Sequence, residues 1–303
     1  LVQFLRNPVK AFFKERLGVG FWSPEQEPGD TEAFGFDGLE NYQLIQSQTR
    51  HWPAPHQCAG LDAVISARLD GLQRAGHLPM QGLGQLKKAE LQGTLTAMAQ
   101  AWAGVGQAFP MVAERVAVSH SHQGAQATVV LRDWIDAVLQ NDAGERSWVL
   151  LEPSKITTTE KKQAVPRPDK LLRPWLQAVL AAAAGQALHG RVVGQDGELH
   201  IGPMPSDQAR QVLDSLLAEW LQGQHEPLPL PLKTALVLAQ AAHSAQDRQN
   251  DQQAETAYEG GGDAMSEQLA EVHEMCLARV FPDFEALCAA RTADGQDASA
   301  LAR

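Results

Sequence analysis

The sequence predicts a mixed α/β or α+β domain with an N-terminal helical layer. Three patterns along the chain support this fold class. Apolar residues recur with helical spacing through residues 1–110. β-Branched runs broken by turn residues follow between 116 and 152, and beyond them a helical segment, a hairpin and further helices alternate. We therefore expect an N-terminal helical region over 1–110 and an α/β core with C-terminal helices over 111–303, together one compact unit.

The opening segment FLRNPVKAFFKERL is amphipathic and predicts a helix. Its apolar side comprises Phe4, Leu5, Phe12, Phe13 and Leu17. Basic residues recur every four positions on another side, at Arg6, Lys10 and Lys14. Pro8 stands where the helix starts or restarts, because the first turn of a helix tolerates a missing N–H.

Further helices are expected before residue 110. Asp37 is a candidate N-cap for a helix that carries Leu39, Tyr42, Leu44 and Ile45. Two more helical segments lie near 60–75 and 83–103, separated by the turn-rich GHLPMQGLG. The first third of the chain therefore reads as a series of helices, with an acidic loop around Pro24, Pro28 and Gly29 after the first of them.

The pattern changes to strands near Val116. The stretch from 116 to 153 reads as three strands in a meander, with turns at Gly124 and in the segment NDAG. A basic, proline-containing connection over 154–174 leads to an apolar helix over 175–185. The segment LHGRVVGQDGELHIGP then predicts a hairpin that turns at 195–197.

The remaining third returns to helical patterns. Ser206 is a candidate N-cap for a helix that ends at Gly223. The acidic, glycine-containing stretch over 249–267 predicts a mobile loop. A last helical segment carries ARVFPDFEALCAAR.

Charge and cysteine content limit the functional classes. The formal net charge of −11 argues against a surface that grips nucleic acid throughout, so any DNA contact should be local. The three cysteines are odd in number and lack C-x-x-C spacing, which indicates neither a disulfide framework nor a zinc site and fits a reduced cytoplasm. The chain opens at Leu1 inside an apolar pattern, and we expect it to be a fragment of a longer subunit.

Three residues resemble the catalytic set of a metal-dependent nuclease, which needs carboxylates around divalent cations and a nearby lysine. Asp136 lies at an expected strand entrance, and Glu152 and Lys155 end the next apolar run. Residues three apart on a strand point to opposite faces, and Pro153 cannot donate to a strand ladder. The spacing therefore favours a strand end with solvated charges, and a live site through a bulge stays open.

His120 and His122 would share one face of a strand, as metal ligands sometimes do. A third ligand is missing nearby in the sequence, so a polar strand edge is the better interpretation. We expect no bound metal, and Mg²⁺ would be needed only if the carboxylate set were live.

Five segments in order resemble one family over nearly the whole chain. They are FLRNPVKAFFKERLGV, EAFGFDGLENYQL, WIDAVLQNDAGERSWVLLEPSK, PLPLPLKTALVLA and RVFPDFEAL. Together they are similar to the C-terminal domain of the RecC family, the gamma chains of exodeoxyribonuclease V. The resemblance implies a degenerate PD-(D/E)XK nuclease fold of the RecB-nuclease type that has lost catalysis and serves as a scaffold.

The resemblance also implies partners and an assembly. The domain would work inside an ATP-dependent helicase–nuclease that processes double-strand DNA ends for recombinational repair. It would dock RecB-like and RecD-like subunits beside the DNA strand-separation path, with the ATPase and nuclease chemistry in the partner chains. No membrane contact is expected, and the localisation would be cytoplasmic, with activity at the nucleoid.

Departures from the active pattern of the resembling family fit a lost site. Active relatives have a glycine where this chain has Asp133, and they carry Gln and Tyr on the following helix, where Gln177 could fill the first role without a Tyr. Some relatives hold an iron–sulfur cluster through a cysteine before a proline, and Asn7 stands there instead. Asp136, Glu152, Lys155 and Gln177 are therefore vestigial candidates, and no cofactor is expected.

The basic connection supplies the first candidates for a DNA contact. They are Lys155, Lys161, Lys162, Arg167, Lys170 and Arg173, and the N-terminal stripe of Arg6, Lys10 and Lys14 is a second set. Because the rest of the chain is acidic, this concentration favours contact with phosphates over a merely solvated loop. Two alternatives remain: an active Mg²⁺-dependent nuclease, and a docking module that contacts protein alone.

Overall fold

The computed structural model describes residues 1–21, 38–58, 60–79, 81–124, 127–160, 162–241, 247–261 and 270–290. These residues fall into two compact units. One, here the terminal unit, lies within 1–27, 122–129 and 214–303, and the other, here the sheet unit, lies within 28–121 and 130–213. The mixed α/β fold class is confirmed, whereas a division near residue 110 stays a prediction from the sequence.

A five-stranded mixed sheet organises the sheet unit. Its order is β1-β4-β5-β8-β9, with β5 parallel to β8 and the other neighbours antiparallel. The strands are β1 (Met111–Val112), β4 (Val138–Gln140), β5 (Arg146–Leu151), β8 (His189–Gly194) and β9 (Gly197–Ile201). The expected hairpin at 195–197 is confirmed as the tight turn between β8 and β9.

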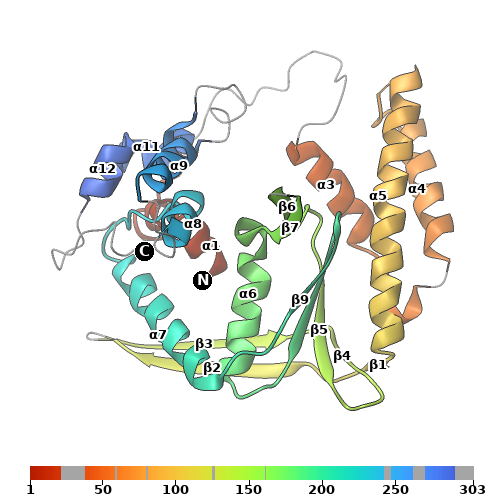
Figure 1. Ribbon diagram of the computed structural model, residues 1–303, viewed down its shortest axis with the longest axis horizontal. Helices are drawn as coiled ribbons and strands as arrows, with labels where there is room; N and C mark the ends of the chain where they lie inside the picture. The colour runs from red at the N-terminus through yellow and green to blue at the C-terminus, as the bar shows by residue number, and fades with distance from the viewer. Residues whose placement is uncertain are drawn as a thin grey trace. The chain divides into compact units, whose positions relative to one another are not determined.

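Two helices enclose this sheet, α5 (Gln81–Ala108) and α6 (Pro168–Ala183), which lie on opposite sides of β5 in Figure 1. Helix α5 places Trp102, Val105 and Phe109 against Val149 and Val193. Helix α6 packs on β8 and connects β5 to it, because parallel neighbours need a crossover. The helix begins seven residues before the expected position 175 and runs through Pro174.

The parallel pair β5–β8 depends on one close contact. Trp148 is fully buried on β5, and its partner in the register is Gly190 on β8. A Cβ at Gly190 would lie 2.1 Å from Trp148 Cζ2, so a side chain at this position would collide with the indole ring. Glycine is therefore the residue that lets the two strands pair around the tryptophan.

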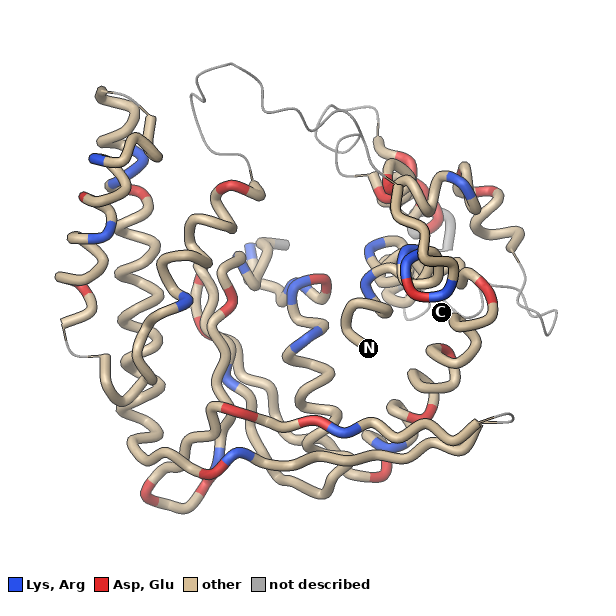
Figure 2. The backbone as a smooth tube through the Cα atoms, turned by 180° about the vertical axis from the view of Figure 1, so that it is seen from behind, with Lys and Arg blue, Asp and Glu red and all other residues tan. Residues whose placement is uncertain are grey.

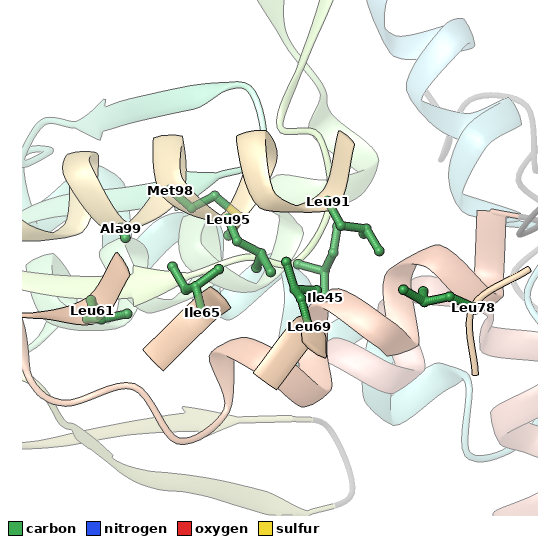
Figure 3. Close-up of a cluster of buried hydrophobic side chains, with 9 residues drawn as sticks. All are labelled: Ile45, Leu61, Ile65, Leu69, Leu78, Leu91, Leu95, Met98 and Ala99. Atoms are coloured by element: carbon green, nitrogen blue, oxygen red, sulfur yellow. The ribbon is translucent and has the colours of Figure 1, made fainter. Parts of the chain in front are cut away.

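A helical layer forms the rest of the sheet unit. It consists of α3 (Gly38–Thr49), α4 (Leu61–Arg74) and the long α5. Their apolar faces meet in one cluster, which Figure 3 shows with the side chains of the three helices directed toward one another. Its buried members are Ile45, Leu61, Ile65, Leu69, Leu78, Leu91, Leu95, Met98 and Ala99. The expected helices near 60–75 and 83–103 are confirmed, whereas the cap at Asp37 lies outside the described residues.

The expected three-stranded meander is wrong in one respect. The segment forms β2 (Val116–Gln123), β3 (Thr128–Ile135), β4 and β5, and the first two make a separate two-stranded sheet. Ala137 interrupts the chain between β3 and β4 with a φ of 52°, a left-handed conformation that breaks a strand. The basic connection is not a plain loop either, since β6 (Thr157–Glu160) and β7 (Gln163–Pro166) pair within it as a hairpin.

Asp196, in the β8–β9 turn, fastens the segment that follows β5. Its carboxylate accepts hydrogen bonds from the N–H groups of Ile156 at 2.8 Å and Thr157 at 2.9 Å, and from the Thr157 hydroxyl at 2.6 Å. Burial alone would raise the pKa of Asp196, but these hydrogen bonds outweigh it and hold the pKa below its ordinary value. The residues after Leu151 are thus tied to the next turn of the sheet.

The terminal unit is helical apart from the hairpin tip. It contains α1 (Val2–Arg6), α2 (Pro8–Ala11), the π-helical turn η1 (Phe12–Arg16), α8 (Leu232–Ala241), α9 (Asp247–Glu259), η4 (Glu271–His273), α11 (Met275–Val280) and α12 (Phe284–Ala289). Helix α7 (Ser206–Gln222) begins in the sheet unit and ends in the terminal unit. The restart at Pro8 is confirmed, and Asn7 Oδ1 caps α2 by accepting from Lys10 N at 2.8 Å.

Two expectations for the C-terminal third are wrong. Ser206 is already helical, and its hydroxyl oxygen has no hydrogen-bond partner within the described residues, so it does not cap α7. The stretch expected as a mobile loop forms α9 over most of its described length. Tyr258 explains this, because it is fully buried in a cluster with Val9 and Leu277 and donates to Phe281 O at 2.5 Å.

In the part of the chain described here, each helix falls short of the length or the apolar character needed to cross a membrane.

Replacing Gly190 with alanine should destabilise the sheet unit by about 3 kcal/mol, because the new methyl group overpacks the ring of Trp148. Gly93→Ala is the matched control, since a Cβ there meets nothing within 4 Å on the exposed side of α5. The control should gain about 0.5–1 kcal/mol from helix propensity. Urea unfolding of both variants measures the difference, and equal stabilities would contradict the close contact.

Asp196→Ala should lower the free energy of unfolding by about 1–2 kcal/mol at pH 7, a figure reduced for the exposure of the carboxylate. The folded-state pKa lies below the unfolded value of about 3.9, so the contribution is complete above about pH 5 and is lost as the pH falls further. Unfolding at pH 7 and pH 3 measures this. Asp196→Asn, which keeps one acceptor oxygen, should fall between, and a pH-independent difference would contradict the role of the carboxylate.

Candidate functional site

A pocket of about 650 Å³ opens at the carboxyl end of β5. Ligand sites in open sheets with parallel strands commonly form outside the carboxyl ends of those strands. The pocket is lined by α3, the segment after it, α5, the end of β5 and α6, all within the sheet unit. Its lining residues are Tyr42, Gln46, Thr49, Arg50, Trp52, Trp102, Val149, Leu150, Leu151, Glu152, Pro153 and Arg173.

Close packing against α5 holds the helical wall of this pocket in place. The indole N–H of Trp102 donates to Pro53 O at 3.0 Å, which fixes the segment after α3. Gly106, one turn further along α5, lets the backbone of Pro55 approach so closely that a Cβ would lie 2.3 Å from its carbonyl. Trp52 packs against the apolar clusters on both sides of this contact. These contacts position Trp52 and Trp102 in the wall of the pocket.

The charged groups of the pocket are two arginines and one glutamate. Within the described part of the chain, neither Arg50 nor Arg173 makes an ion pair or a side-chain hydrogen bond, and both are exposed. Glu152 is half-buried, and its Oε1 accepts from Ser154 N at 3.3 Å. The pocket therefore carries a net positive charge although the whole chain is acidic.

Asp136 lies apart from this pocket. It is exposed between β3 and β4, just before the left-handed Ala137, and it is absent from the pocket lining. Asp136 was expected at the entrance of a strand, and it lies two residues before β4, which begins at Val138. The irregular backbone at Ala137 means that strand alternation does not carry over from β4 to Asp136.

Lys155 is also separate from the pocket. The strand ends at Leu151, and the next residues form a turn that is bonded to the β8–β9 connection. Gln195 N donates to Ser154 O at 3.1 Å, and Ile156 N donates to Asp196. Lys155 lies exposed between these two attachments, outside the pocket lining.

Metal-ligating groups do not gather anywhere in the described ranges. Among the residues that the structure describes, no three or more His, Cys, Asp or Glu side chains lie together in a way that could hold a metal ion. Gln177, the remaining vestigial candidate, is half-buried on α6, one turn beyond Arg173, and does not line the pocket. Of the four vestigial candidates, the structure places Glu152 alone at the pocket.

The basic connection contributes unequally to an anion-binding surface. Arg167 and Lys170 both lie near Asp169, with N–O distances of 3.1 and 3.6 Å, at the start of α6. Figure 2 shows basic positions gathered along the beginning of this helix. Lys162 is exposed in the β6–β7 turn with a φ of 69°, and Lys161 lies outside the described residues. Arg173 differs from Arg167 and Lys170 because it makes no ion pair within the described residues, and of these three it alone lines the pocket.

The N-terminal basic stripe belongs to the terminal unit. Arg6, Lys10 and Lys14 are all exposed, and they fall on three successive short elements. Lys10 Nζ pairs with Glu274 at 3.4 Å, so part of this charge is already compensated. Of the two histidines considered as metal ligands, His122 forms a polar pair in which its Nδ1 lies 3.0 Å from Asp214 Oδ1.

Sequence reasoning missed most of the pocket. Arg50, Trp52 and Trp102 come from a helical region in which no motif marks a site. The sequence offers one signal, Trp52 in the dipeptide His51-Trp52 after α3. An aromatic residue at such a position, however, usually belongs to a core. Arg173 was identified, through its place in the basic connection.

The chain matches the model of the RecC C-terminal domain family over residues 1–243. It is 26% identical over 235 residues to the RecBCD enzyme subunit RecC of Escherichia coli (strain K12), which covers 75% of this chain and 18% of that protein. The RecBCD enzyme subunit RecC of Haemophilus influenzae (strain ATCC 51907 / DSM 11121 / KW20 / Rd) is 24% identical over 230 residues, with the same two shares.

The chain therefore spans less than a fifth of the length of these curated relatives. The family match covers well over half of the chain and extends from the first residue through α8. It confirms the resemblance for the four segments that lie within 1–243, whereas RVFPDFEAL lies beyond the match, and the chain belongs to the RecC C-terminal domain family.

Proposed function

We propose that this chain is a non-catalytic scaffold and DNA-guiding domain of a RecC-type subunit. It would work in a helicase–nuclease that processes double-strand DNA ends for recombinational repair, as the RecBCD subunit names of its relatives suggest. One observation carries the proposal: the pocket at the end of β5 holds Glu152 with two unpaired arginines, while Asp136 and Lys155 lie outside it. That arrangement suits binding an anion better than holding a divalent cation.

The sheet topology supports a degenerate PD-(D/E)XK ancestry. An antiparallel pair, β4–β5, is followed by the crossover helix α6 and the parallel strand β8, so Glu152 stands at the end of a central strand beside a helix. A two-metal nuclease needs several carboxylates at such a position. Here the following turn, with Pro153 and the attachments to Gln195 and Asp196, uses the segment for structure.

The distribution of charge supports a local DNA contact. Within the described residues, Lys155, Lys162 and Arg173 pair with no acidic group, and Arg167 and Lys170 share the carboxylate of Asp169. Phosphate binding depends on clustered lysine and arginine. The basic stretch over 155–173 therefore suits a DNA-facing surface better than the rest of this acidic chain does. RecB-like and RecD-like subunits would cover other faces.

Cleavage assays separate the scaffold from an active Mg²⁺-dependent nuclease. The chain, incubated with linear single- and double-stranded DNA and Mg²⁺ or Mn²⁺, should leave both substrates intact. Asp136→Ala and Glu152→Ala should behave the same, because Asp136 does not line the pocket at which Glu152 lies. Cleavage by the wild type that both substitutions abolish would establish a live site instead, and a cation bound between them.

Charge reversal tests the DNA contact against a docking module that binds protein alone. Lys162→Glu should weaken DNA binding by the complex assembled with RecB-like and RecD-like subunits by about 3- to 10-fold at about 50 mM salt, with a smaller effect at 200 mM. Arg74→Glu is the control, since it makes the same charge change on exposed α4. Equal DNA handling by both variants, with normal assembly, would favour the docking module.

A further inference from the structure

Two unpaired guanidinium groups line the same pocket, and the proposal concerns what they bind. Arg50 ends the α3 region and Arg173 lies on α6, so the two reach the pocket from elements more than a hundred residues apart. A guanidinium presents its N–H donors in a planar fork that matches the oxygens of a phosphate. Two such groups without a protein acceptor within the described residues leave donors available for a ligand.

The charge of the pocket selects among anions. Two arginines and Glu152 leave one positive charge, which matches the single negative charge of an internal phosphodiester. A terminal phosphate carries about −1.5 to −2 at neutral pH and would meet the glutamate with its excess charge. A free divalent cation would face two arginines with one carboxylate, so it does not fit.

The remaining wall is aromatic. Tyr42, Trp52 and Trp102 line the pocket, and Trp102 is held by its bond to Pro53. Every nucleobase has a π-face that stacks on such rings without regard to sequence. A volume of about 650 Å³ suits a single small-molecule-sized unit, and a base must be unpaired to enter it.

We propose that this pocket holds one unpaired nucleotide of a DNA strand, with its phosphodiester between Arg50 and Arg173 and its base against Trp52. The inference rests on the proposed DNA-guiding function and adds to it a defined subsite. A guided strand would thereby be gripped at one nucleotide, independent of sequence, at the carboxyl end of β5.

The test measures binding of fluorescein-labelled dT12 to the full chain by anisotropy. Arg50→Gln and Arg173→Gln should each weaken binding by roughly 10-fold, and the double variant by much less than the product, because both contact one phosphate. The salt dependence of the double variant should fall by about 0.7 in log–log slope, the value for one phosphate on a single strand. Arg74→Gln, equal in charge change and outside the pocket, should change affinity less than 2-fold.

A comparison of dT12 with an abasic DNA strand separates the contribution of base stacking from that of phosphate charge. Tryptophan fluorescence of the chain should be quenched by dT12 and not by a twelve-residue abasic strand at equal saturation. Trp52→Phe, which keeps an aromatic ring in the packed wall, should remove most of the quenching while the affinity for the abasic strand stays within 2-fold.

The outcomes distinguish the two proposals. If the chain binds dT12 but both glutamine variants match Arg74→Gln, the subsite is wrong and the DNA-guiding function stands. If the wild-type chain binds neither strand at low salt, the DNA contact itself fails and the subsite fails with it. Quenching that is equal with the abasic strand would overturn the placement of the base.

Discussion

The pairing of β5 with β8 around Trp148 is the constraint on which the sheet unit depends. A fully buried indole against Gly190 sets the spacing of the two parallel strands, and the crossover helix α6 follows from their parallel direction. Because β5 ends at Leu151, Glu152 emerges beside α6 and Arg173, while α5 brings Trp102 from the opposite face. The position of the pocket thus follows from where β5 ends between the helices, and Arg50 reaches it from the α3 region while Arg173 reaches it from α6.

The segment after β5 is held by hydrogen bonds to the turn between β8 and β9. In a metal-dependent nuclease, carboxylates converge on the bound cations, whereas here Gln195 and Asp196 bind the backbone of 153–157. The Asp196 carboxylate accepts hydrogen bonds from two backbone N–H groups and one hydroxyl. In a free turn these donors would be hydrogen-bonded to water instead. Asp196, which holds this segment in place, is therefore an acidic residue that the nuclease-like pattern does not include.

Elements with strong local signals were predictable, and those decided by distant contacts were not. The helix over α4, the restart at Pro8 and the turn at Gln195 follow from periodicity, proline chemistry and turn residues near each other in the chain. Helix α9 was missed because its polar composition favours a loop, and burial of Tyr258 and Ala254 overrides that preference. The break at Ala137 carries no glycine to mark it. For the site, Glu152 and Arg173 could be named from the sequence, whereas Arg50 and Trp102 meet them only through the packing of α5.

A pocket lined by arginines and a pocket that holds a metal ion act differently on a phosphodiester. A Mg²⁺ ion held by carboxylates activates water and stabilises the leaving oxygen, so binding and cleavage come together. Guanidinium groups supply positive charge and directed donors without activating water, since they remain protonated at any physiological pH. A pocket with Arg50 and Arg173 and one structural glutamate can therefore hold a phosphodiester and leave it whole. Under the proposed DNA-guiding function, retention without hydrolysis is the property that such a surface requires.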